Sequence, residues 1–171
     1  MAIERAGATM WKGDKRTLVG PELKAGDTAP EATLHAQDLT DVMLLASTSG
    51  KVRLLNVVMS VSTGICGPQT KRFDEEAAKL PNVAAVTISM DLPFTMKEFC
   101  GAKDVKHVLL SDHRRAEFGE KYGILVKETR WLGRAIFVVG SDNKITYAAY
   151  SPEIAAHPDY DAALAALKAA K

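Results

Sequence analysis

The sequence has few cysteines and no long apolar run. Only 2 of its 171 residues are cysteine, which is too few for a disulfide framework in a chain of this size. No uninterrupted apolar stretch approaches the ~20 residues of a membrane-spanning helix, and residues 1–10 lack the apolar core of a secretory signal peptide. We therefore expect a cytoplasmic protein whose two thiols are either reactive or simply buried.

The sequence also lacks an excess of charge of one sign. Lysine and arginine number 22 and aspartate and glutamate 21, so the formal net charge is +1. Binding to a phosphate backbone or to an anionic membrane surface is driven by a surplus of positive charge. The composition therefore argues against nucleic acid or a membrane as a partner.

Ligand patterns for metals and nucleotides are missing as well. The four histidines are scattered and do not show the spacing of a zinc or other metal site. No glycine-rich phosphate-binding loop is present. We expect no metal and no organic cofactor, and the histidines are His35, His107, His113 and His157.

Strand-like and helix-like patterns alternate along the chain. With 47% hydrophobic residues, 171 residues are enough for one domain with a full core, so we expect a single domain over residues 1–171. The apolar run 52–59 is typical of a central strand that is buried on both faces. The expected elements are a hairpin over 8–19, strands over 31–35, 52–59, 83–89, 107–110, 134–139 and 144–150, and helices over 68–80, 94–101, 115–122 and 159–168. This order predicts a thioredoxin-like α/β sandwich with an N-terminal β-hairpin extension.

Cys66 stands where a buried strand and a polar loop give way to a helix. In the first turn of a helix, unpaired backbone N–H groups and the positive end of the helix dipole favour the nucleophilic thiolate. Loops at the C-terminal ends of sheet strands are also where α/β proteins carry their chemistry. We therefore predict that Cys66 is reactive, and that the hydroxyl of Thr63 points toward its sulfur or toward a bound oxygen atom.

Arg134 and Cys100 are ambiguous from their own positions. A lone guanidinium before an apolar strand usually reaches solvent, but a thiolate that cleaves a peroxide needs a permanent cation beside it. Cys100, in a short helix, is either an inert core residue or a second thiol that attacks an oxidised Cys66. A disulfide requires the two Cα atoms within about 7 Å, so a larger resting distance would require local unfolding.

These residues resemble a known family, the thiol peroxidase group of peroxiredoxins, which are atypical two-cysteine enzymes. Two blocks, Asp91-Leu-Pro-Phe94 and Pro158-Asp-Tyr-Asp-Ala-Ala-Leu164, are particularly specific to this group. Further matching blocks are Gly26-Asp27-Thr-Ala-Pro30, Asp38-Leu-Thr-Asp41, Ser60-Val-Ser-Thr-Gly-Ile-Cys66, Thr70-Lys-Arg-Phe73, Ile88-Ser-Met, Phe99-Cys100, Ser111-Asp112-His-Arg114, Phe118-Gly119, Tyr122-Gly123 and Gly133-Arg-Ala-Ile-Phe137.

The resemblance implies a role for each candidate residue. Cys66 would be the peroxidatic cysteine, Cys100 the resolving cysteine, Thr63 the hydroxyl that orients thiolate and peroxide, and Arg134 the activating cation. It also implies a thioredoxin fold, a homodimer, no metal or organic cofactor, hydroperoxide substrates and thioredoxin as the reductant.

The chain departs from the family pattern at two positions in the loop before Cys66. The pattern is Pro-x-x-x-Thr-x-x-Cys, and Met59 stands in place of the proline, while Ser62 stands where an aspartate is common. Methionine removes a backbone restriction and adds an oxidisable thioether. Two alternatives therefore remain open: a diverged slow or non-catalytic peroxide sensor, and a thiol-disulfide oxidoreductase, which would ordinarily carry Cys-x-x-Cys although residue 69 is glutamine.

Overall fold

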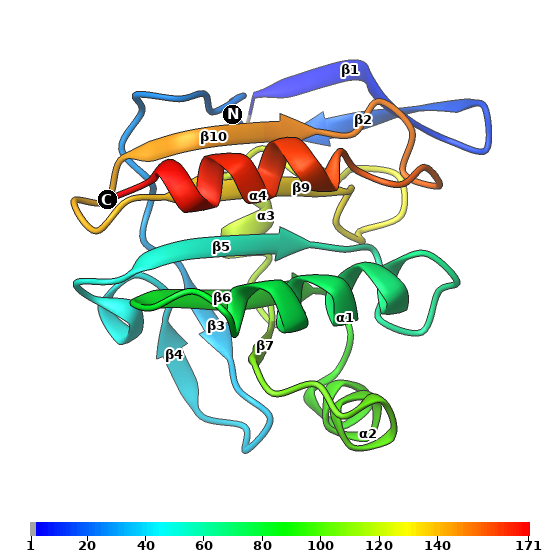
Figure 1. Ribbon diagram of the computed structural model, residues 1–171. Helices are drawn as coiled ribbons and strands as arrows, with labels where there is room; N and C mark the ends of the chain where they lie inside the picture. Colours follow the sequence, from blue (N-terminus) through cyan, green and yellow to red (C-terminus); the bar gives the residue numbers. More distant parts are fainter. Residues whose placement is uncertain (1–2) are drawn as a thin grey trace.

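The computed structural model describes residues 3–171, and a seven-stranded sheet forms its centre (Figure 1). The strands lie in the order β10-β9-β5-β6-β7-β3-β4; β5, β6 and β7 are parallel, and β9 is antiparallel to β5. The sheet strands are β3 (Thr33–His35), β4 (Asp41–Met43), β5 (Val52–Val57), β6 (Val83–Ser89), β7 (Val108–Ser111), β9 (Ala135–Val139) and β10 (Ile145–Tyr150). The helices are α1 (Cys66–Ala77), α2 (Pro93–Lys103), α3 (Glu117–Lys121) and α4 (Tyr160–Ala169), with a short 3-10 helix at Ala46–Thr48.

A separate small sheet confirms the predicted N-terminal hairpin. It contains β1 (Glu4–Trp11) and β2 (Asp14–Val19), and β8 (Leu125–Val126) adds a third strand. The chain reverses at Lys12 and Gly13, where Gly13 has a φ of +87°, a conformation that glycine adopts without steric cost. The thioredoxin-like α/β fold with a hairpin extension is therefore the observed architecture.

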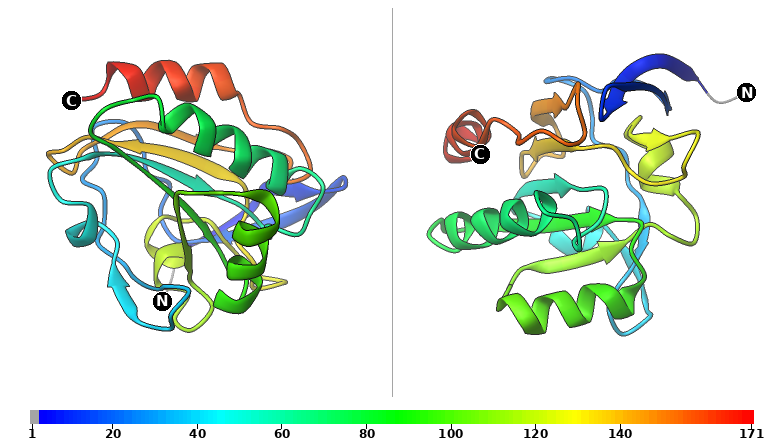
Figure 2. Two further views of the ribbon diagram at one scale, coloured as in Figure 1. Left: turned by 60° about the horizontal axis from the view of Figure 1, so that its bottom comes forward. Right: turned by 90° about the vertical axis from the view of Figure 1, so that its right-hand side faces the viewer.

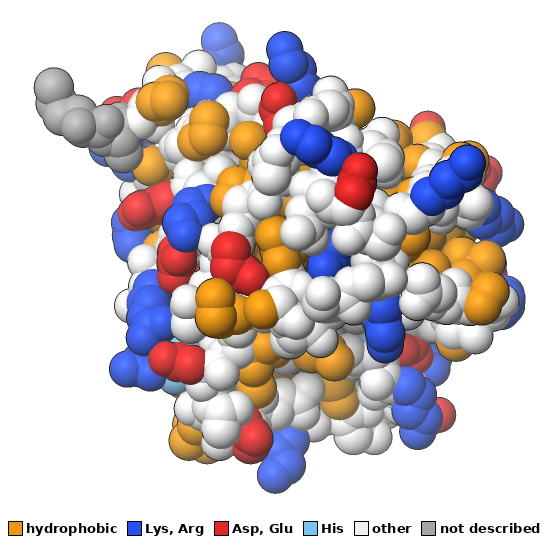
Figure 3. All heavy atoms as spheres, turned by 90° about the vertical axis from the view of Figure 1, so that its left-hand side faces the viewer, with side chains coloured by type: hydrophobic (Ala, Val, Ile, Leu, Met, Phe, Trp, Pro, Cys, Tyr) orange, Lys and Arg blue, Asp and Glu red, His pale blue; other side chains and the backbone are white. Residues whose placement is uncertain are grey.

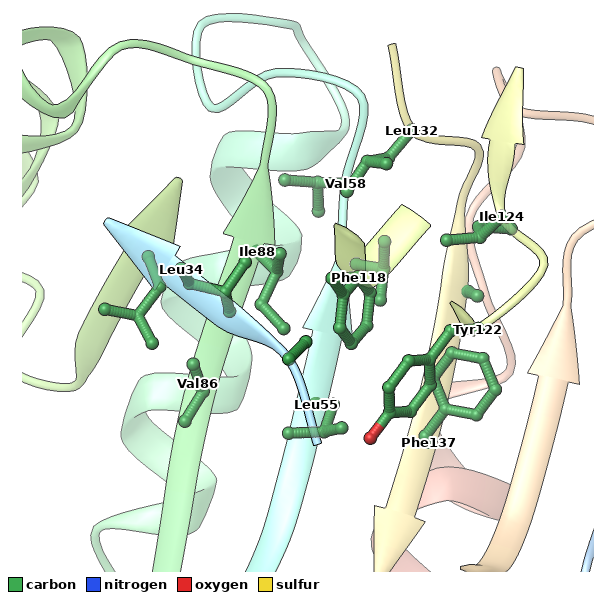
Figure 4. Close-up of a cluster of buried hydrophobic side chains, with 14 of the residues drawn as sticks. Leu34, Leu55, Val58, Val86, Ile88, Phe118, Tyr122, Ile124, Leu132 and Phe137 are labelled. Carbon is green, nitrogen blue, oxygen red and sulfur yellow. The ribbon is translucent and has the colours of Figure 1, made fainter. Parts of the chain in front are cut away.

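Two apolar layers enclose the main sheet. Helices α1 and α4 lie on one face, and α3 and the small sheet lie on the other (Figure 2). Because side chains alternate along a strand, Ile136 and Val138 of β9 belong to the layer beneath α1 and α4, while Phe137 belongs to the opposite layer. There Phe137 packs edge-on against Tyr122, which stacks on Phe118 of α3 at 4.1 Å between ring centroids (Figure 4).

Most sequence expectations hold to within a few residues, and the differences are local. The expected strand 83–89 matches β6, and every residue of β5 is buried, as the apolar run predicted. Helix α1 begins two residues before the expected start, at Cys66, so Pro68 is its third residue. Helix α3 is shorter than expected, and β4 and β8 were not predicted because two or three residues carry too little pattern.

The surface carries charges of both signs. On the face in Figure 3, basic and acidic side chains are interspersed and apolar side chains lie in small groups. Among residues 3–171, no helix is long and apolar enough to span a membrane.

Candidate active site

Cys66 is the first residue of α1, and its side chain is fully buried. The loop before it already turns like a helix: the Thr63 N–H donates to the Ser60 carbonyl, and the Gly67 N–H donates to the Thr63 carbonyl. The Gln69 N–H donates in the same way to the Ile65 carbonyl. The N–H groups of residues 67 and 69 are therefore hydrogen-bonded to backbone carbonyls and are not unpaired, as the sequence-based argument expected of N–H groups in the first turn.

A buried guanidinium lies beside the sulfur. Arg134 is only 2% exposed, so its side chain does not reach solvent. Its Nη2 donates to Cys66 Sγ at 3.3 Å, its Nε donates to the Ile154 carbonyl at 2.9 Å, and its Nη1 donates to the side-chain oxygen of Gln69. In residues 3–171 no carboxylate lies within salt-bridge distance of Arg134. The positive charge is therefore available to hold an anionic sulfur.

Strand pairing explains how residues 68 positions apart in the sequence meet. Strand β9 is antiparallel to β5, and Ala135 pairs with Val57. Arg134, one residue before Ala135, therefore lies at the end of β5 where the loop to Cys66 begins. The central parallel strands β5 and β6 also end on this side, which is the usual location of a site in an α/β sheet.

Gln69, which accepts from Arg134, belongs to a group of buried polar side chains to which the sequence analysis gave no role. Gln69 Nε2 donates to Asn56 Oδ1 at 2.5 Å, and Asn56 Nδ2 donates to the hydroxyls of Thr87 and Thr70 at 2.9 and 3.2 Å. All four side chains are fully buried. The signal in the sequence was a polar residue inside each of two apolar strands, Asn56 in β5 and Thr87 in β6, because buried amides and hydroxyls need partners.

Thr63 lies near Cys66 in the loop but has a different partner in this state. Its hydroxyl donates to the Ser60 carbonyl at 3.0 Å rather than to the sulfur. Thr63 also lines a cavity of about 520 Å³ between the start of α1 and α2, together with Gly67 and Phe99. The lone pairs of the hydroxyl remain available to accept a hydrogen bond from a molecule in this cavity.

Asp91, in the loop between β6 and α2, holds the loop that precedes Cys66. Its carboxylate accepts from the Ser60 hydroxyl at 2.6 Å, the Val61 N–H at 2.8 Å and the Ser89 hydroxyl at 2.7 Å. The Ser62 hydroxyl contacts that of Ser60 at 2.8 Å. Because these bonds fix the loop backbone, they supply a restraint where Met59 replaces the family's proline.

Cys100 lies in α2, outside the hydrogen bonds around Cys66. Its side chain is partly buried and accepts from Gln37 Nε2 at 3.4 Å, and both cysteines are free thiols. Burial raises the pKa of the Cys100 thiol, and the charge of Asp74 acts in the same direction, although the Gln37 hydrogen bond opposes them. The structure thus brings Cys66 and Arg134 together and leaves Cys100 as a protonated thiol on another helix.

Two of the four histidines pair with carboxylates. His35 Nε2 lies 2.7 Å from Asp41, and His107 Nδ1 lies 3.0 Å from Asp74. Within residues 3–171 no three side chains of histidine, cysteine, aspartate or glutamate gather into a metal-binding group.

Comparisons with known proteins give matches along nearly the whole chain. A family model described as Redoxin matches residues 24–164. The chain is 49% identical to a thiol peroxidase of Oceanobacillus iheyensis over 158 residues, which cover 92% of this chain and 96% of that protein. It is 46% identical to a thiol peroxidase of Bacillus subtilis over 160 residues, with 93% and 95% covered.

Solved structures give the same result for the fold. A peroxiredoxin-like protein from Aquifex aeolicus superimposes with a TM-score of 0.88 at 36% identity, over 95% of this chain and 96% of that one. A thiol peroxidase from Chromobacterium violaceum superimposes with a TM-score of 0.84 over 94% of both chains, and at 21% identity it supports the fold alone.

Proposed function

The chain belongs to the thiol peroxidase family of peroxiredoxin enzymes, and on that premise we propose that it reduces hydrogen peroxide and alkyl hydroperoxides with Cys66 as the peroxidatic cysteine. The observation that carries the proposal is the buried guanidinium of Arg134, which donates to the Cys66 sulfur at 3.3 Å and has no carboxylate partner in the described chain. A cation in that position stabilises the thiolate, which is the nucleophilic form of cysteine.

In the first step, the Cys66 thiolate attacks the terminal oxygen of the hydroperoxide. A sulfur–oxygen bond forms, the oxygen–oxygen bond breaks, and the leaving oxygen takes a proton and departs as water or alcohol. Cys66 becomes a sulfenic acid. Arg134 stabilises the negative charge that moves from the sulfur to the leaving oxygen.

Access to the sulfur requires movement of the loop before α1. The Cys66 side chain has no exposed surface, while Thr63 and Gly67 line the cavity of about 520 Å³ next to it. A small displacement of residues 61–65 connects this cavity with the sulfur. Thr63 then orients the thiolate and the peroxide with its hydroxyl, as the family resemblance implies.

In the second step, Cys100 attacks the sulfenic acid, which releases water and forms an intramolecular disulfide. Bridging requires Cα atoms within about 7 Å of each other. Cys66 is buried at the start of α1 and Cys100 lies in α2. If their resting distance exceeds this limit, the start of α1 and the helix around Cys100 must fray before the bond forms. The disulfide is then reduced by a dithiol, for which the family resemblance suggests thioredoxin. The homodimer and the cytoplasmic location remain predictions.

Two cysteine variants test these assignments. Cys66→Ser should abolish peroxide consumption, whereas Cys100→Ser should allow one turnover and then stall in the presence of thioredoxin. The measurement is peroxide consumed per protein, first without and then with the reductant. Full cycling of the Cys66→Ser protein would overturn the proposal.

A peroxide sensor is the second candidate, because Met59 and Ser62 depart from the family pattern. A sensor would accumulate the oxidised form, and thioredoxin would not reduce it. Its rate of peroxide reduction should increase greatly when Met59→Pro and Ser62→Asp restore the family residues. A thiol-disulfide oxidoreductase has less support, since Gln69 occupies the second cysteine position of Cys-x-x-Cys and contacts Arg134 instead. Reduction of insulin disulfides without peroxide consumption would favour that activity.

A further inference from the structure

A row of hydrogen-bonded side chains runs beneath α1 from Arg134 to a histidine–carboxylate pair. The carboxylate of this pair lies in α1, about one helix turn beyond Thr70. We propose that this pair, Asp74 and His107, positions Arg134 against the Cys66 sulfur through the row. The inference rests on the proposed peroxidase function. The buried polar row consists of Gln69, Asn56, Thr87, His107 and Asp74, in order from Arg134.

Three members of the buried polar row are fully buried, and the side chains of the other two are nearly so. Asn56, Gln69 and Thr87 have no exposed surface, and the side chains of His107 and Asp74 are each 8% exposed. Thr87 Oγ1 lies 2.7 Å from His107 Nε2, and His107 Nδ1 lies 3.0 Å from Asp74 Oδ1. Water cannot replace a wrongly oriented partner at Asn56, Gln69 and Thr87, so the direction of each bond between them matters.

The direction is set at the Asp74 end. Burial alone would raise the pKa of Asp74, but hydrogen bonds from the backbone N–H groups of His107 and Lys106 hold it below its usual value. Both N–H groups donate to Oδ1, the same oxygen that faces His107 Nδ1. A carboxylate only accepts, so Nδ1 carries the proton. Burial lowers the pKa of His107, against the opposing effect of Asp74, so the ring is neutral and Nε2 is an acceptor.

The remaining bonds follow from this tautomer. The Thr87 hydroxyl donates its one proton to His107 Nε2, so its oxygen can only accept from Asn56. Asn56 must then present its NH₂ group to Thr87 and its oxygen to Gln69. Gln69 in turn gives its NH₂ group to Asn56, which leaves its oxygen for Arg134.

The opposite orientation would oppose the cation. If the Asn56 amide turned over, its NH₂ group would face Gln69, and Gln69 would have to turn its oxygen toward Asn56. The NH₂ group of Gln69 would then face the guanidinium, so that two donors would meet in a buried site. Arg134 would lose one of its three acceptors and its fixed position beside Cys66. Thr70 cannot prevent this, because it is a side branch: its hydroxyl also accepts from Asn56, but it does not connect to His107.

Thr70 therefore supplies a matched control. Thr87→Val and Thr70→Val each remove one fully buried hydroxyl of similar shape that accepts from Asn56. We expect Thr87→Val to lower the thiolate absorbance of Cys66 at neutral pH and to lower the single-turnover rate with hydrogen peroxide about tenfold, the scale of one buried hydrogen bond. Thr70→Val should change both by about twofold or less. Equal effects of the two substitutions would overturn the proposal.

Conservative variants separate positioning from simple destabilisation. Thr87→Ser keeps the hydroxyl, and Asp74→Asn keeps an oxygen for the two backbone N–H groups and His107, so both should stay within about twofold of the wild type in thiolate absorbance. His107→Phe removes the Nε2 acceptor of Thr87. Because His107 also lines a surface groove, this variant should show the same loss of thiolate absorbance as Thr87→Val even if Thr87→Val itself folds poorly. A loss of unfolding free energy without a change in thiolate absorbance in His107→Phe would contradict the positioning role.

The thiolate measurement also distinguishes this inference from the proposed function. It requires no peroxide and no reductant. A wild-type protein that consumes no peroxide would overturn the proposed function, while the comparison of Thr87→Val with Thr70→Val would still decide whether the row positions Arg134.

Discussion

Arg134→Gln removes the charge that the structure places next to Cys66. The Nη2–Sγ distance is 3.3 Å, which at an effective dielectric constant of about 20 corresponds to a Coulomb attraction of about 5 kcal/mol for a thiolate. A hydrogen bond to a charged group contributes less on balance, about 1.5–3 kcal/mol. We therefore expect the rate of the first step to fall about 10- to 150-fold, since about 1.4 kcal/mol corresponds to a factor of ten.

The assay is a rapid-mixing experiment in which sulfenic acid formation on Cys66 is quenched and quantified by mass spectrometry. Arg53 offers a matched control, because it is 1% exposed and, among residues 3–171, donates only to the neutral oxygens of Thr48, Leu45 and Gly140. Arg53→Gln should destabilise the fold and leave the rate of the folded protein within about twofold. An Arg134→Gln rate equal to that of Arg53→Gln would refute the role of the cation.

Three further variants probe the loop and the fold. Asp91→Ala should lower the unfolding free energy by about 2–4 kcal/mol, because three hydrogen bonds to a carboxylate are lost. It should also speed disulfide formation, measured by thiol counting. An unchanged rate of disulfide formation would contradict the restraint that Asp91 places on the loop. Met59→Pro with Ser62→Asp should raise the peroxide rate less than about threefold, since Asp91 already holds the loop; a gain of several orders of magnitude would favour the sensor. Burial raises the pKa of Asp112 from 3.8 to about 6. The stabilisation that comes from the protonated Asp112 carboxyl is therefore fully present below the unfolded-state pKa of 3.8 and is lost as the pH rises through about 6. Urea titrations should show this loss, about 3 kcal/mol at most, in the wild type and not in Asp112→Asn; identical pH profiles would contradict it.

Local patterns predicted most of the fold. The apolar run of β5, the alternation of strands and helices and the turn at Gly13 depend on neighbouring residues, so they are legible in the sequence. The position of Cys66 at a helix start is of the same kind. The family resemblance added the roles of the residues, which no local pattern contains.

Contacts between distant segments were beyond that reasoning. Arg134 is buried rather than solvent-facing because the register of β9 against β5 places it beside the Cys66 loop, and register between strands 78 residues apart (57 and 135) is not a local property. Tertiary packing also determines the hydrogen-bond partner of Thr63, the hydrogen bonds from the loop to Asp91 and the buried polar row. Polar residues inside apolar strands marked the place of the row, but its order and direction came only from the hydrogen bonds.

The ultraviolet absorbance of the Cys66 thiolate tests most directly whether Arg134 stabilises the anionic sulfur. The difference in absorbance between the wild type and Cys66→Ser, followed against pH, isolates the ionisation of this one sulfur. We expect the thiolate to be present at neutral pH and to be largely lost there in Arg134→Gln. A sulfur that ionises only near pH ~8.5, as free cysteine does, and does so equally in both proteins would contradict this account.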